Sequence, residues 1–297
     1  MKSPKNAVRL GYVAFALSSF LLSLYCTFPA QVVTMRLAQE VARASSGQVR
    51  FQVAEADLWR LSGLAAHQVR LQIGDNAPVL VDAFRVRLRL LPLLLLRASV
   101  YAQVQLGQGL AELVLALDKS HAAEVRLDAI DLTRPAWLAR QLGVPMQGVV
   151  SGSATLANAP RWPMVNGDLE VELDRLSFGP TTVEGVGLPQ IGLGKVELTV
   201  NVAEGQARIA SLRQQGGNVQ LEARGKVVLG EPLEASVLDV CGRIKVEPAF
   251  LQQNPKLAAA LHLAEVQLKR DANGFLNVPL AGSMRAPQLR PGLCPAR

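Results

Sequence analysis

The stretch DLEVELD, residues 168–174, alternates strictly between acidic and aliphatic side chains. Successive side chains of a β-strand point to opposite faces, so this period of two predicts a strand with one buried and one solvated face. The same alternation returns at 84–90, 196–202, 219–223 and 237–246. These runs predict a mainly β protein.

Short glycine-containing segments separate the alternating runs, and they predict tight reversals because glycine adopts positive φ angles without strain. They are Gly74-Asp75-Asn76, Gly107-Gln108-Gly109, Ala203-Glu204-Gly205, Gly216-Gly217-Asn218 and Gly230-Glu231-Pro232. Strands joined by short turns favour an antiparallel meander over helical crossovers. We therefore expect a long, curved antiparallel sheet, either an open groove or a flattened barrel. The few short helices are expected at 32–44, 135–142 and 248–263, the last interrupted by Pro255.

The N-terminal segment has the pattern of a membrane anchor. Three basic residues precede an uncharged stretch whose apolar part, 10–28, would span about 28 Å as a helix, close to the roughly 30 Å of a hydrocarbon core. A cleaved signal peptide and a lipoprotein signal ending at Cys26 are the alternatives, but Phe28 is bulky where a cleavage site needs a small residue. We expect a single-pass protein of the bacterial inner membrane, with a cytoplasmic N-terminus at 1–9, an anchor at 10–28, a membrane-proximal helix at 29–46 and a periplasmic β domain at 47–297.

Composition argues against a nucleic-acid-binding protein. The 297 residues carry a net charge of +7, three charges of which come from the first nine residues, and only 5% of residues are aromatic. Nucleic-acid binding needs a clustered basic face or stacking aromatics, and the sequence shows neither. The hydrophobic content of 49% is sufficient for a folded domain.

The sequence contains no recognisable catalytic, cofactor or metal motif. His67, His121 and His262 have no second histidine or cysteine at a ligand spacing. Ser151-Gly152-Ser153 is not a nucleophile elbow, and the glycines of 185–194 lack a nucleotide-binding spacing, so a flexible connection is expected there. We predict that the protein is not an enzyme and has no cofactor or metal; an envelope hydrolase is the alternative that these absences disfavour.

Two surfaces and one cysteine pair are candidate sites. Arg85, Arg87 and Arg89 would form a basic stripe for anionic lipid or an acidic partner, or simply a wet strand face. The apolar run that follows is too short to cross a bilayer and would be either buried core or an apolar lip on membrane or partner; its candidate contact residues are Leu93, Leu94, Leu95 and Leu96. Cys241 and Cys294 could form a disulfide in an oxidising compartment or remain free thiols.

Several segments together resemble a known family. They are Phe28-Pro29 before a polar helix, Leu58-Trp59-Arg60-Leu61-Ser62-Gly63-Leu64, the basic strand entering Leu90–Leu96, Ile130-Asp131-Leu132-Thr133 with Trp137-Leu138, Gly148-Val149-Val150-Ser151-Gly152, Gly225–Leu229 with Pro232–Ser236, and Val278–Ser283 before Pro287. With this layout the chain resembles type II secretion system protein N (GspN), particularly its deltaproteobacterial form. The resemblance implies a non-enzymatic inner-membrane accessory whose periplasmic β domain binds other type II secretion subunits.

A second hypothesis is lipid handling, because a long curved sheet with one apolar face can hold acyl chains. The segment Gly282–Pro287 is similar to the strand ends of groove-forming envelope proteins of the AsmA type. The expected partners are therefore the inner membrane and other secretion subunits, with phospholipid as the alternative ligand.

Overall fold

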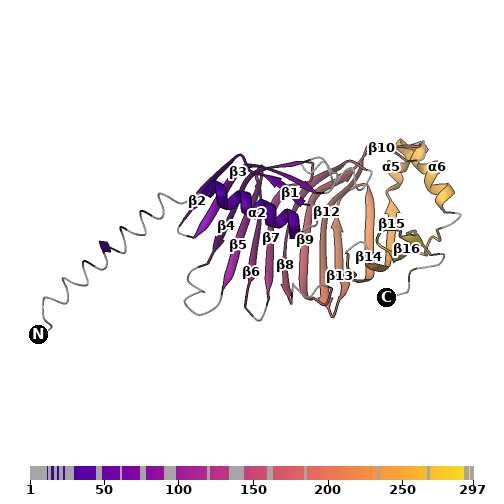
Figure 1. Ribbon diagram of the computed structural model, residues 1–297. Coiled ribbons are helices and arrows are strands. Elements are labelled where there is room, and N and C mark those ends of the chain that lie inside the picture. Colours follow the sequence, from indigo (N-terminus) through magenta and orange to yellow (C-terminus); the bar gives the residue numbers. More distant parts are fainter. Residues whose placement is uncertain are drawn as a thin grey trace, which may run out of the picture. The chain divides into compact units, whose positions relative to one another are not determined.

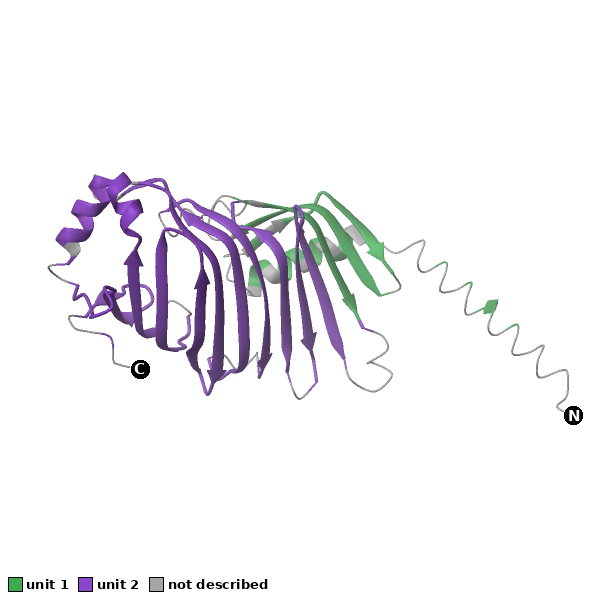
Figure 2. Ribbon diagram, turned by 180° about the vertical axis from the view of Figure 1, so that it is seen from behind, with its two compact units in different colours: residues 1–88 green, residues 89–297 purple. Residues whose placement is uncertain are grey.

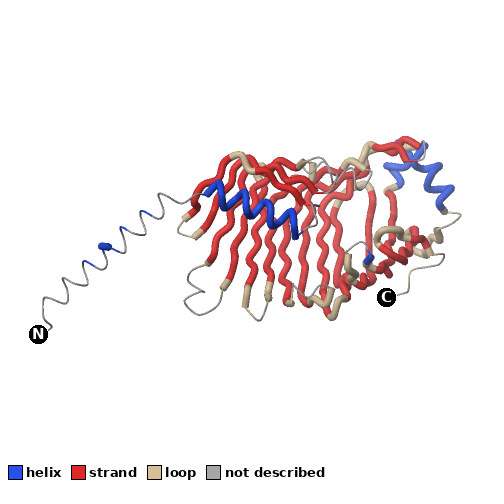
Figure 3. Tube along the Cα trace, in the orientation of Figure 1, coloured by secondary structure: helices blue, strands red, loops and turns tan. Residues whose placement is uncertain are grey.

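The computed structural model places the following residues: 30–44, 49–60, 62–73, 78–89, 98–118, 121–133, 144–158, 163–183, 186–232, 235–265, 268–290 and 294, together with Tyr12, Phe15, Ala16, Ser19 and Ser23. The protein is mainly β, with 62% strand and few short helices, which confirms the predicted class (Figure 3). The chain divides into two compact units, Met1–Leu88 and Arg89–Arg297 (Figure 2). The sequence pattern predicted a single domain over 47–297 and gave no sign of this boundary.

Unit 1 is built around one long strand. Its described elements are α2 (Ala30–Ala44), β1 (Val49–Gln52), β2 (Glu55–Trp59), β3 (Gly63–Ile73) and β4 (Val79–Leu88). β3 pairs with β4 along one edge, while β1 and β2 pair with successive halves of its other edge, all antiparallel. α2 packs against β1 and β2 and exposes Arg36, Glu40 and Arg43, as the sequence predicts for 32–44.

Unit 2 is an antiparallel meander. Its elements are β5 (Ser99–Leu106), β6 (Gly109–Ala116), β7 (Ala123–Asp131), β8 (Met146–Ala157), β9 (Asn166–Phe178), β10 (Thr181–Val183), β11 (Val186–Leu188), β12 (Ile191–Ala203), β13 (Gln206–Gln215), β14 (Val219–Val228), β15 (Val237–Val246), α5 (Pro248–Gln253), α6 (Pro255–Ala264), β16 (Leu276–Ser283) and β17 (Gln288–Leu289). The strands lie side by side in chain order (Figure 1), except that β10 and β11 form a separate hairpin between β9 and β12. The described strands do not close on themselves, so the open sheet, and not the flattened barrel, is the form that the chain adopts.

Turn chemistry and prolines explain where the elements of unit 2 begin and end. Glu204 and Gly205 join β12 to β13 with φ angles of 50° and 74°, the left-handed pair that a tight hairpin requires. Pro255 separates α5 from α6, because proline starts a helix readily but cannot continue one. α6 packs against β11.

The described part of the glycine-rich segment, from Val186 onward, lies mainly in strands, so the flexible connection expected there is wrong. Residues 186–188 form β11, and β12 begins at Ile191. At Gly194 (φ 70°) a Cβ atom would lie 2.4 Å from the carbonyl oxygen of Gln215, so only glycine lets the β13–β14 turn approach this closely.

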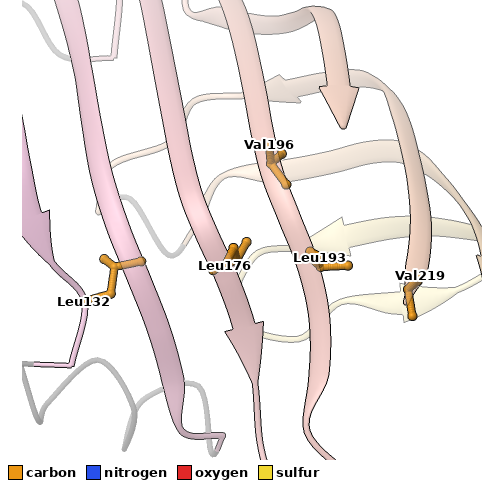
Figure 4. Packing of buried hydrophobic residues seen from close by; sticks show 5 residues of the cluster. All are labelled: Leu132, Leu176, Leu193, Val196 and Val219. Carbon is orange, nitrogen blue, oxygen red and sulfur yellow. The ribbon is translucent and has the colours of Figure 1, made fainter. Parts of the chain in front are cut away.

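The buried core of unit 2 lies toward one end of the strands. Leu132, Leu176, Leu193, Val196 and Val219 form one cluster from three strands, β9, β12 and β14, and the turn after β7 (Figure 4). Val196 is 3% exposed and Leu176 is 4% exposed. This cluster stabilises the sheet at the end that carries the turn between β13 and β14.

Two predicted elements lie outside the described residues. They are the helix expected at 135–142 and the anchor expected at 10–28, of which only five separate residues are described. Within the part of the chain that the structure describes, no helix combines the length and the apolar character needed to span a bilayer. The anchor therefore stays a prediction.

Candidate functional site

One face of the unit 2 sheet is apolar across many strands, because the register places aliphatic residues of neighbouring strands opposite one another. Two cross-strand rows run from β5 to β13: Val104, Ala111, Leu127, Gly152, Val171, Leu198 and Leu212, and Ala102, Leu113, Val125, Ala154, Leu169, Val200 and Ile209. We call these 14 residues the apolar face. It contains no charged residue and no side-chain hydrogen-bonding group.

The apolar face is only partly buried. Most of its side chains are half-buried, and Leu113 is 38% exposed. They pack sideways against their cross-strand neighbours. The described helices of unit 2, α5 and α6, pack against each other, and α6 packs against β11. Within the described part of unit 2, therefore, no second layer covers β5–β9. Such an extended apolar surface is unusual unless something binds to it.

The opposite face carries the charged side chains of these strands. On β9, Asp168, Glu170, Glu172 and Asp174 are exposed at alternate positions, as the alternation predicts. Lys195 of β12 bridges the carboxylates of Glu172 and Glu197, at 2.9 Å each. Its hydrogen bonds to Glu172 and then Glu197 raise the pKa of the Lys195 ammonium, so this cation remains charged at all physiological pH values.

The basic stripe predicted on β4 has a different environment. Arg85 and Arg87 lie on the same side of the sheet as Trp59, because Trp59 pairs with Gly63 and Gly63 pairs with Arg87. The guanidinium carbons of Arg87, Arg60 and Arg85 lie 5.1, 5.5 and 5.8 Å from the centre of the Trp59 ring. These are cation–π distances, and Arg85 and Arg87 are half-buried. Arg85 and Arg87 are therefore less exposed than a wet strand face predicts, and their contact with lipid or an acidic partner stays a prediction.

The remaining predicted contact residues divide into two groups. Arg89 follows β4 and is exposed. Leu93, Leu94, Leu95 and Leu96 lie outside the described residues. Trp59, the centre of the arginine cluster, was not predicted as a site residue, although a tryptophan two strands away from alternating arginines was the available signal.

Cys241 of β15 and Cys294 form a disulfide, with their Cα atoms 5.7 Å apart. The backbone N–H of Cys294 also donates to Asn277 Oδ1 at 3.2 Å. By the chain-entropy argument, a link across 53 residues stabilises the fold by about 4 kcal/mol. It fixes residue 294 to the sheet formed by β15 and β16.

The histidines and Ser151 do not form a catalytic arrangement with one another. His67 is on β3, His121 is in the turn before β7 with its Nδ1 atom 2.5 Å from the Asp118 carbonyl, and His262 is exposed on α6. Ser151 lies within β8 and accepts a hydrogen bond from the Ala129 amide. No group of three metal-ligating side chains occurs among the described residues. The prediction of a non-enzyme remains a prediction.

Comparisons of the chain with protein families, with curated proteins and with solved structures found no match. The resemblance to protein N of the type II secretion system therefore stays a proposal.

Proposed function

We propose that the protein is a non-enzymatic lipid-binding protein of the bacterial envelope, which holds the acyl chains of phospholipids against the apolar face of unit 2. The observation that carries this proposal is the pairing of aliphatic residues across the strands from β5 to β13, with Gly152 as the one position without an aliphatic side chain. Six inter-strand spacings of about 4.8 Å give this surface a length of roughly 29 Å. That length suits extended hydrocarbon chains.

Lipid fits this surface better than a protein partner does. Protein–protein interfaces carry roughly one hydrogen bond per 100–200 Å² and place polar groups among their apolar contacts. The apolar face offers no side-chain donor or acceptor along its length. Acyl chains need none, and they gain about 0.8 kcal/mol for each CH₂ group removed from water.

Site-specific photo-crosslinking in cells tests the proposal. A photoreactive phenylalanine analogue at position 113, which is exposed on the apolar face, should yield a phospholipid adduct detectable by mass spectrometry. The matched control is position 124, an exposed site on the polar side of the neighbouring strand β7. Equal lipid labelling at both positions, or none at position 113, would contradict the proposal.

A second proposal retains the role implied by the family resemblance: an accessory of type II secretion, anchored in the inner membrane, whose β domain binds another secretion subunit. The observation that favours it is the exposed run of Asp168, Glu170, Glu172 and Asp174, which suits a basic partner surface. Pull-down of the tagged native protein should recover secretion subunits. The variant that neutralises the four acids, Asp168→Asn/Glu170→Gln/Glu172→Gln/Asp174→Asn, should no longer recover secretion subunits. A variant at the apolar face, Leu113→Gln, should still recover them. Recovery of no secretion subunit by the wild type would contradict this role.

A further inference from the structure

The sheet of unit 2 opens between β13 and β14. These ten-residue strands pair only at Gln206–Arg208 with Lys226–Val228. Ala210 is the extra residue of a bulge against β12, so β13 bends there. On the facing strand, a Cβ atom at Gly225 (φ 137°) would lie 2.2 Å from the Asp239 carbonyl oxygen, so glycine allows β14 to follow β15 closely. The two strands therefore diverge from this point.

The side chain of Gln214 bridges the far end of the gap. Its amide nitrogen donates to the carbonyls of Leu193, at 2.7 Å, and Val219, and its amide oxygen accepts from the N–H of Leu221. A cavity of about 900 Å³ lies along this gap, bordered by β13, β14, β15 and the turn between β13 and β14. We call it the β13–β14 opening.

The opening carries two arginines that have no anionic partner. The side chains of Arg213 and Arg224 make no ion pair or hydrogen bond to any described residue, and the Nε atom of Arg224 is buried. Arg243, the neighbouring cation, already pairs with Glu222 at 2.6 Å and with Asp271. The carboxylate that pairs across the ladder with Arg213, Glu197, is held by Lys195.

The surrounding polar side adds further positive charge. Arg208 and Lys226 stand directly opposite each other in the ladder, an unfavourable arrangement for like charges. Arg224 is opposite Cys241, which is uncharged in the disulfide. A buried guanidinium nitrogen without an acceptor costs free energy that an anion would recover, and arginine binds phosphate oxygens through paired hydrogen bonds.

We infer that the β13–β14 opening binds the phosphate headgroup of an anionic phospholipid through Arg213 and Arg224. This inference rests on the proposed lipid-binding function. The same cavity is bordered by Ile209 and Leu212 of the apolar face, so it presents cationic and aliphatic groups together. An amphipathic anion uses both kinds of group, whereas free phosphate uses only the arginines.

Binding measurements on the delipidated full-length protein in detergent test the inference. By native mass spectrometry, the wild type should prefer phosphatidylglycerol to phosphatidylcholine. The Arg213→Gln/Arg224→Gln variant should lose phosphatidylglycerol binding by at least about tenfold and keep phosphatidylcholine binding. Arg126→Gln, which removes an exposed charge from β7, is the matched control and should bind both lipids as the wild type does.

The possible outcomes distinguish failure of the proposed lipid-binding function from failure of the headgroup site. If the wild type binds neither lipid, the proposed function fails. If it binds both equally, and the double variant does the same, only the headgroup site is overturned. Inorganic phosphate binding that depends on the two arginines, without a preference between lipids, would assign the opening to free phosphate and overturn the lipid headgroup. Circular dichroism should show the same folded spectrum for the wild type and every variant, and Arg213→Lys/Arg224→Lys should retain partial preference because it keeps the charge and loses the paired donors.

Discussion

Strands β4 and β9 have the same kind of sequence but opposite surroundings. Both alternate charged and aliphatic residues, yet β9 exposes its carboxylates while β4 places Arg85 and Arg87 beside Trp59. On β4 the arginines share a face with the buried Val81 and Ala83, and Leu80, on the other face, is 58% exposed. Alternation shows that two faces differ; the residues on neighbouring strands decide which face is covered.

The largest expected effect comes from placing a charge on the apolar side beside β9. Val196 pairs with Leu173 of β9 and is 3% exposed, so Val196→Asp should lower the free energy of unfolding by about 4 kcal/mol. Urea unfolding followed by circular dichroism measures this loss. Thr199→Asp, on the polar side of the same strand, is the control and should cost about 0.5 kcal/mol. Equal losses would show that the two sides of β12 do not differ as described.

Removal of the aromatic partner in unit 1 should have the next largest effect. Trp59→Ala removes the ring beneath three guanidinium groups and should destabilise unit 1 by about 3 kcal/mol, whereas Trp59→Phe should recover part of that loss. The loss in the alanine variant can be measured as faster amide hydrogen exchange in β3 and β4. If the alanine and phenylalanine variants exchange alike, the arginines do not depend on the ring.

The exposed acids of β9 contrast with a mostly buried cluster of ion pairs around Arg243 of β15. Arg243, whose side chain is 18% exposed, donates to Glu222 and Asp271, so Arg243→Met should cost about 2 kcal/mol. Burial opposes ionisation of Asp271, but the hydrogen bonds from Arg243, Phe275 and Asn273 outweigh it and hold the pKa of this carboxyl below its usual value.

The ion pair between Arg243 and Asp271 predicts that the stability of the fold depends on pH. Because the pKa of Asp271 is lowered by folding, its contribution is present above the usual carboxyl pKa and is lost as the pH falls through the folded-state pKa. The stability difference between the wild type and Asp271→Asn should therefore be constant near neutral pH and shrink in acid below about pH 4. A difference that does not change between pH 7 and pH 3 would rule out this linkage.

The smallest effect is expected on the acidic strand itself. Glu170→Gln should change stability by less than about 0.5 kcal/mol, because the side chain is exposed and its nearest like charges lie two residues away. At low salt the change should be slightly stabilising and should vanish in 1 M NaCl, where the Debye length is about 3 Å. Thermal unfolding at two salt concentrations measures it. A loss above 1 kcal/mol would mean that the acid has a structural partner.

The main features of the fold were predictable because they depend on local patterns. Alternation located β9, β12 and β15, and turn residues such as Glu204 and Gly205 marked a hairpin. Pro255 correctly divided the two C-terminal helices. These signals lie within a few residues of the structure that they specify.

The remaining features depend on partners distant in the sequence. The burial of Arg87 depends on Trp59, 28 positions earlier, and the opening depends on Gln214 reaching Leu193 and Leu221. The pairing of Cys241 with Cys294 likewise needs the register of β15 and β16. No short window of sequence contains both members of these contacts.

The chain-order pairing of unit 2 has a consequence for how the polypeptide assembles. Each strand from β6 to β9 docks on the one made just before it, so loop closure costs little at every step and growth proceeds in one direction as the polypeptide emerges. At each stage the last strand formed has an unpaired backbone edge. Until the next strand forms, this edge can pair with another nascent copy of the chain.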